Sequence, residues 1–262
     1  MYPLYGRKRF VDQMAFKIGY FPIKCPVCNS LFIYKIKSEN FREDCTCMSC
    51  RSFNRQRQIS SVMIRSVLKK KPLFSSLSDF VGRDDLHVYY TESKGPVHDS
   101  LHRMKHYVCS EYFGEEYKSG TFVDGIMHQD LQNLSFGDNT FDVILSSEVF
   151  EHIPDTYRAF KEVYRVLKPG GRHIFTVPFD AQSFTDVIKA IRDENGKIQY
   201  LTEPEYHDDP IRPDGGVLVY QIFSLEMLIK LNKIGFVTKM HQLHDPFTGI
   251  LGNNAIVFES IK

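Results

Sequence analysis

The chain has 262 residues, a formal net charge of +1 at pH 7, 42% hydrophobic residues and 25% charged residues. This composition is ordinary for a soluble globular protein, and no run approaches the ~18 apolar residues that a membrane span needs. The basic N-terminus, MYPLYGRKRF, lacks the apolar stretch of a signal peptide, so we expect a cytoplasmic protein.

Charge is distributed unevenly along the chain. Residues 1–75 contain 15 Lys or Arg against 4 Asp or Glu, whereas residues 76–262 contain 18 against 28. We therefore expect two domains, 1–75 and 76–262, with a boundary near 72–84. The basic module either docks on its acidic neighbour or binds an anionic partner such as nucleic acid, a sugar phosphate or a lipid head group.

Five of the six cysteines fall between positions 25 and 50, in CPVC and CTCMSC. Two CxxC pairs, Cys25/Cys28 and Cys47/Cys50, have the spacing of a tetrahedral four-sulfur site, for which Zn²⁺ is the default metal. Such a site is closed and therefore structural. Cys45 is an alternative to Cys47 as the fourth ligand.

A strand is expected in SLFIYKIKS, between the two CxxC pairs, and a helix in RSFNRQRQISSVMIRSVLKK, after them. Arg51, Arg55 and Arg57 lie near the start of that helix. They either bind phosphate or brace the cysteine module, and the sequence leaves both possibilities open.

Strand and helix patterns alternate from residue 86 onward. The expected strands are LHVYYT, HYVCSEY, TFVDGIMHQ, FDVILSS and GRHIFTVPF. This alternation predicts an α/β fold with a parallel, Rossmann-like sheet and helices on both faces. A last helix, FSLEMLIKLNKIGF, is followed by two strands, FVTKMHQLHD and NNAIVFESIK, whose short connection predicts an antiparallel terminal hairpin.

The stretch NTFDVILSSEVFEHIPDTYRAFKEVYRVLKPGGRHIFTVPF, residues 139–179, resembles the class I S-adenosylmethionine-dependent methyltransferases, in particular those of type 11. The resemblance extends over residues 86–262 and implies S-adenosylmethionine as cofactor. It places Glu111 on the ribose hydroxyls and Asp130 beside the adenine. It also implies a set of neighbouring cofactor-binding residues: Tyr90, Gly95, Tyr112, Leu131, Ser147 and Glu148.

The loop after the first of these strands departs from the family pattern. The family uses LDxGxGxG, whereas LHVYYTES has Tyr89, Thr91 and Ser93 in place of the three glycines. Since S-adenosylmethionine carries no phosphate, this loop need not cradle a pyrophosphate. We expect Thr91, Glu92 and Ser93 to hold the methionine end, with Glu92 pairing with the ammonium group. A subgroup resembling this chain over its full length also has a cysteine module and an acid-containing loop.

Two histidines are candidates for catalysis. His152 follows the FDVILSS strand, and His207 lies in EPEYHDDPIRPDGG, where this fold inserts acceptor-binding structure. Our hypothesis is that His207, oriented by an adjacent acid such as Asp208, deprotonates an acceptor hydroxyl. The alternatives are a helix-bracing role for His152 and, for the cluster Tyr206 to Asp209, metal binding or loop capping.

The expected function is O-methylation of a small molecule, sugar or glycoconjugate by an S-adenosylmethionine-dependent enzyme. Relatives of the subgroup tend to accompany surface-polysaccharide biosynthesis. An RNA or protein methyltransferase, with the basic module binding the polymer, is the first alternative. The second is a zinc-stapled binding protein without catalysis, which the loop without glycines keeps open.

Overall fold

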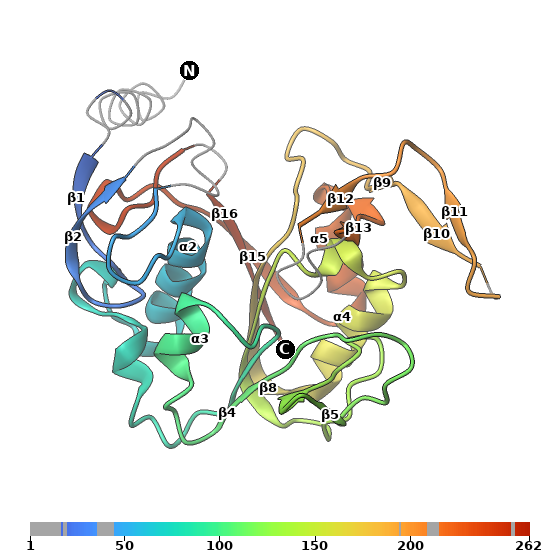
Figure 1. The fold of residues 1–262 in the computed structure, drawn as a ribbon, viewed down its shortest axis with the longest axis horizontal. Coiled ribbons are helices and arrows are strands. Elements are labelled where there is room, and N and C mark those ends of the chain that lie inside the picture. Colours follow the sequence, from blue (N-terminus) through green and yellow to red (C-terminus); the bar gives the residue numbers. More distant parts are fainter. Residues whose placement is uncertain (1–16, 18–19, 36–44, 194, 209–214, 253–254) are drawn as a thin grey trace.

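The computed structural model describes residues 17, 20–35, 45–193, 195–208, 215–252 and 255–262. One six-stranded sheet organises the chain, in the order β15-β16-β8-β7-β3-β4 (Figure 1). Its strands are β3 (Val88–Tyr90), β4 (Tyr107–Cys109), β7 (Phe141–Ser147), β8 (Leu167–Thr176), β15 (Val237–Gln242) and β16 (Ile256–Ile261). Strands β4, β3, β7 and β8 are mutually parallel, and β16 runs antiparallel to both β8 and β15.

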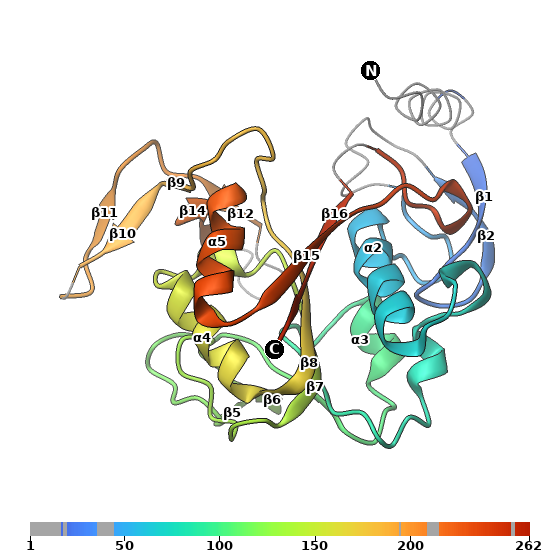
Figure 2. The ribbon, with the colours of Figure 1, turned by 180° about the vertical axis from the view of Figure 1, so that it is seen from behind.

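Helices cover both faces of this sheet (Figures 1 and 2). Helices α2 (Asn54–Met63) and α3 (Pro96–Leu101) lie on one face, and α4 (Thr156–Val166) and α5 (Leu225–Ile234) lie on the other. Strand alternation explains the division, because Val88 and Tyr90 pack with the first group whereas Tyr89 packs with the second. The predicted α/β architecture is therefore present.

The cysteine segments belong to the first of these two cores. Buried Cys25, Cys45 and Cys47 share one hydrophobic cluster with Leu77 and with the sheet residue Val143. This cluster extends across the expected division at residues 75/76. Here β1 (Tyr20–Lys24) pairs antiparallel with β2 (Leu31–Lys35), and α2 continues as a π-helical turn over Ile64–Leu68. Short 3₁₀ turns, Pro72–Phe74 and Leu77–Phe80, then lead to β3.

The prediction of one strand over TFVDGIMHQ is wrong. This segment forms an antiparallel hairpin of β5 (Phe122–Val123) and β6 (Ile126–Met127). Asp124 and Gly125 both have positive φ, 49° and 80°, as a two-residue hairpin turn requires. An isolated parallel bridge between Glu111 and His128 connects this hairpin to the segment that follows β4.

The segment between β8 and α5 carries short antiparallel pairs and lies over the sheet's carboxyl edge. They are β9 (Val187–Ile188), β10 (Ala190–Arg192), β11 (Ile198–Tyr200), β12 (Tyr206–His207), β13 (Val217–Leu218) and β14 (Gln221–Ile222). β10 pairs with β11, β12 with β13 and β14 with β9. Along the described part of the chain, no helix is both long and apolar enough to cross a membrane.

Helix α4 gives a small, local test of the fold. The Asp155 side chain caps it by accepting a hydrogen bond from the Arg158 backbone N–H at 3.0 Å. Asp155→Ala is expected to lower the free energy of unfolding by ~1 kcal/mol, because it leaves that N–H without its cap. Urea denaturation followed by circular dichroism measures this, with exposed Asp84→Ala as the control. An unchanged midpoint would contradict the capping role.

Candidate functional site

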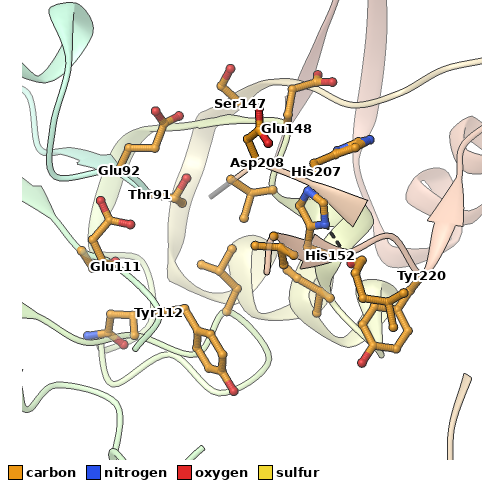
Figure 3. A pocket seen from close by; sticks show the side chains of 18 of the residues that line it. Thr91, Glu92, Glu111, Tyr112, Ser147, Glu148, His152, His207, Asp208 and Tyr220 are labelled. Atoms are coloured by element: carbon orange, nitrogen blue, oxygen red, sulfur yellow. Dashed lines mark hydrogen bonds between the residues drawn. The ribbon is translucent and has the colours of Figure 1, made fainter. Parts of the chain in front are cut away.

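A cavity of about 1820 Å³ opens at the carboxyl ends of β3, β4, β7 and β8. Each strand contributes its last residue or residues that follow it by one to three positions, as in open α/β sheets that bind ligands at this edge. Figure 3 shows Thr91, Glu92 and Glu111 towards one end of the cavity and His152 and His207 towards the other. Further parts of the wall come from the start of α2, from the segment after β6 and from the β9–β14 segment.

The acidic loop after β3 faces the cavity through Thr91 and Glu92. The Glu92 Oε1 and Thr91 Oγ1 atoms are buried and have no hydrogen-bond partner among the described residues. Burial raises the pKa of the Glu92 carboxyl to about 7, against the lowering effect of the Arg55 guanidinium. Such unpartnered buried atoms are costly, and a ligand with matching polar groups would satisfy them.

Ser93 and Tyr90 do not line the cavity. The Ser93 backbone N–H and hydroxyl both donate to Glu111 Oε1, at 2.7 and 2.9 Å, so Ser93 orients that carboxylate. Tyr90 is buried among the residues that pack against α2, and its hydroxyl lies close enough to the Glu92 carboxyl to lower the pKa of that group. Gly95, with φ +92°, lines the cavity at the start of α3.

The other expected cofactor residues come together at the same edge. The cavity lining includes Glu111, Tyr112, Asp130, Leu131, Ser147 and Glu148. Asp130 Oδ1 accepts a hydrogen bond from the Gln132 backbone N–H at 2.8 Å. Glu148 adopts a left-handed conformation, φ +55°, at the turn that follows β7.

Two of the arginines near the start of α2 have different surroundings, and one of them has the bracing role that the sequence left open. Arg57 is fully buried and donates to the carbonyls of Cys45, Ser52 and Gly249, so it braces the cysteine module. Arg55 lines the cavity and donates to the Ser147 hydroxyl. Residues two apart on a helix point in different directions, and this spacing explains why Arg55 faces the cavity whereas Arg57 faces the cysteine module.

The far end of the cavity gathers two histidines around a buried acid that the sequence analysis missed. Glu151 is fully buried, and its Oε1 atom lies 3.7 Å from His152 Nε2 and 3.8 Å from His207 Nδ1. The two rings meet edge to face, with centroids 5.0 Å apart. We call Glu151, His152 and His207 the Glu-His cluster.

His207 lies close to two carboxylates. It lies on β12, and its Nε2 atom is 3.4 Å from Glu205 Oε1. Asp208 is exposed and lines the cavity beside it, whereas Asp209 lies outside the described residues. The carboxylates that the structure records within ion-pair distance of His207 are therefore those of Glu151 and Glu205.

The four sulfurs of Cys25, Cys28, Cys47 and Cys50 lie within 4.8 Å of one another. Cys25 Sγ and Cys50 Sγ are 3.8 Å apart, the edge of a tetrahedron with bonds of about 2.3 Å to a central zinc ion. Asn29 and Arg51, at equivalent places after the two knuckles, both have φ near +60°. Cys45 stands outside this group of four, and its carbonyl accepts from Arg57. The donor set therefore fits a tetrahedral thiolate-bound ion.

Part of the chain matches a known protein family. Residues 103–175 match the model of a family described as a methyltransferase domain. This stretch carries a methyltransferase-domain sequence. It runs from just before β4 to the end of β8 and includes Glu111, Asp130, Glu148 and His152. The match agrees with the predicted methyltransferase sequence over the part of the chain that it covers.

Curated relatives match over similar, short stretches. The demethylmenaquinone methyltransferase of Staphylococcus epidermidis is 33% identical over 87 residues, covering 31% of this chain and 36% of that protein. The sarcosine/dimethylglycine N-methyltransferase of Halorhodospira halochloris is 32% identical over 85 residues, covering 32% of this chain and 30% of the relative. The chain thus spans about a third of the length of these relatives.

Among solved structures, the chain is similar to an S-adenosylmethionine-dependent methyltransferase from Mesorhizobium loti. The TM-score is 0.41 at 15% identity, over 68% of this chain and 91% of the other. A methyltransferase structure from Methanosarcina mazei has a TM-score of 0.38 at 18% identity, over 68% and 92%. At these values neither likeness bears on function.

Proposed function

We propose that the chain is an S-adenosylmethionine-dependent methyltransferase that transfers a methyl group to a hydroxyl of a small molecule, sugar or glycoconjugate. The observation that carries the proposal is one cavity with two histidines at one end and, at the other, buried acid and hydroxyl atoms that have no hydrogen-bond partner among the described residues. The methyltransferase-domain match of residues 103–175 supports it. We also propose a cytoplasmic location.

The residues at the first end fit the cofactor's polar groups. Glu92 would accept from the ammonium group of the methionine end, and Thr91 together with Arg55 would bind its carboxylate. Glu111, held by Ser93, would accept from the ribose hydroxyls, and Asp130 would lie beside the adenine. Tyr112, Leu131, Ser147, Glu148 and Gly95 would form the surrounding walls, with Tyr90 supporting the loop from behind. When bound, S-adenosylmethionine supplies an electrophilic methyl group.

The acceptor would bind at the histidine end. Methyl transfer depends mainly on positioning, and a hydroxyl acceptor must also lose its proton. His152 Nδ1 lies 2.9 Å from the Leu218 carbonyl, which fixes the ring at the cavity wall. We assign the acceptor's proton to His207, with exposed Asp208 beside it as the route to solvent.

His207→Ala tests this assignment. Turnover is expected to fall at least ~100-fold, a typical contribution of acid–base catalysis, while S-adenosylhomocysteine binding stays unchanged. The measurement is transfer of labelled methyl to a panel of hydroxylated and amine acceptors, with exposed His102→Ala as the matched control. Undiminished turnover in His207→Ala would remove the assignment, and transfer to amines alone would replace O-methylation.

The four-cysteine site would hold a structural zinc ion. The start of α2, directly after the second knuckle, supplies Phe53, Arg55 and Gln56 to the cavity wall. The cysteine module would therefore complete the cofactor site. This placement favours a small-molecule acceptor over a polymer-binding role for the module.

A further inference from the structure

We propose that the Glu-His cluster, Glu151, His152 and His207, binds a divalent transition-metal ion, with Zn²⁺ the best match to its two imidazoles and one carboxylate. The ion site is separate from the four-cysteine site. Metal binding at this cluster does not depend on the proposed methyltransferase activity. The catalytic role that we assign to the ion does rest on the proposed function.

The distances in the cluster fit a shared ion. One ligand atom from each residue lies within 4.8 Å of the others, and Glu151 Oε1 is 3.7 and 3.8 Å from the two ring nitrogens. Atoms bound tetrahedrally at about 2.0–2.1 Å from zinc lie about 3.3 Å apart. Side-chain movements of about an ångström or less would therefore bring the three atoms onto one ion.

Each ring has an acceptor beside its outer nitrogen, so that its inner nitrogen faces the centre of the cluster. His152 Nδ1 lies 2.9 Å from the Leu218 carbonyl, which can only accept, so Nδ1 carries the proton and Nε2 is left as the ligand atom. His207 Nε2 lies 3.4 Å from Glu205 Oε1, which likewise leaves Nδ1 facing Glu151. Carbonyl and carboxylate partners on the outer nitrogen are the usual support of metal-binding histidines.

The exposure of the three side chains fits a metal site that is open on one side. The Glu151 side chain is fully buried. The histidine side chains are 14% and 34% exposed and line the cavity. Three protein ligands with one side open to a cavity is the arrangement of catalytic rather than structural zinc.

The ion would give the cluster its chemistry. An acceptor hydroxyl bound at the open position would have its pKa lowered by the metal. Its O–H bond would break with the electron pair left on oxygen, and the proton would pass to the carboxylate of Asp208, which is exposed beside His207. In the loaded protein His207 would therefore act as a ligand, in place of taking the proton itself.

Metal counting on the full chain tests the site. After equilibration with Zn²⁺ and removal of excess, we expect two ions per chain in the parent and in the control His102→Ala. We expect one ion in His207→Ala and one in Glu151→Gln, a substitution of the same shape. With Co²⁺ in place of zinc, the ion that remains should keep its thiolate charge-transfer absorption.

One ion in the parent, or a second ion retained in both variants, would overturn the inference. Circular dichroism checks that Glu151→Gln folds; should it not fold, the more exposed His207→Ala decides. Titration with S-adenosylhomocysteine separates the two proposals. Binding of S-adenosylhomocysteine with one ion in the parent refutes the metal site alone, and two ions without S-adenosylhomocysteine binding refutes the methyltransferase function alone.

Discussion

Glu92→Gln is expected to weaken S-adenosylhomocysteine binding by roughly 10- to 150-fold, the equivalent of the ~1.5–3 kcal/mol that a hydrogen bond to a charged group contributes. The reason is geometric and electrostatic. Glu92 Oε1 is buried at the cavity with no partner among the described residues, and the proposed partner is the ligand's ammonium group. Calorimetric titration measures the change, and Glu203→Gln, an exposed acid away from the cavity, is the control.

The same residue predicts a pH dependence. Burial raises the pKa of the Glu92 carboxyl to about 7, so the group is neutral below that pH and charged above it. Only the charged form pairs fully with an ammonium group, so affinity should rise between pH 6 and pH 8. In Glu92→Gln this rise should disappear. A variant with the parent's affinity and the parent's pH profile would show that the loop does not hold the methionine end.

Cys28→Ser is expected to release a zinc ion and to lower the free energy of unfolding by several kcal/mol. This is part of the apparent ~10–16 kcal/mol that structural zinc contributes in zinc-finger peptides. The loss should extend beyond the knuckles, because Cys25, Cys47 and Leu77 share one buried cluster with the sheet. Cofactor affinity should fall too, since Arg55 and Gln56 follow the second knuckle into the cavity wall.

Zinc content by elemental analysis and urea denaturation measure these effects on the full chain. Cys109→Ser is the matched control, because this half-buried thiol in β4 stands outside the four-sulfur group. Treatment of the parent with a strong chelator should cause the same loss of unfolding free energy as the variant. Full zinc content and an unchanged midpoint in Cys28→Ser would contradict the structural role of the site.

Local sequence signals predicted most of the elements and placed several candidate residues at one edge of the sheet. Parallel strands end at one edge, so Thr91, Glu92, Glu111 and Ser147, each at or just after a strand end, line one cavity. Strand periodicity also explains why Tyr90 does not line the cavity, since it shares a face of the sheet with Val88. The Asp124-Gly125 pair was a readable hairpin signal that the single-strand prediction for TFVDGIMHQ overlooked.

Long-range contacts could not be predicted in the same way. Glu151 meets His207 only because the β9–β14 segment folds back over the end of β7, and no local pattern encodes that approach. Arg55 reaches Ser147 across 92 positions of the chain for the same reason. The burial that raises the pKa of Glu92 is likewise a property of the assembled cavity.

Calorimetric titration of the full chain with S-adenosylhomocysteine tests the central claim most directly. We predict binding at one site per chain, with an affinity that rises with pH through about 7 and falls in Glu92→Gln. Absence of binding at millimolar ligand would contradict the assignment of this cavity to S-adenosylmethionine.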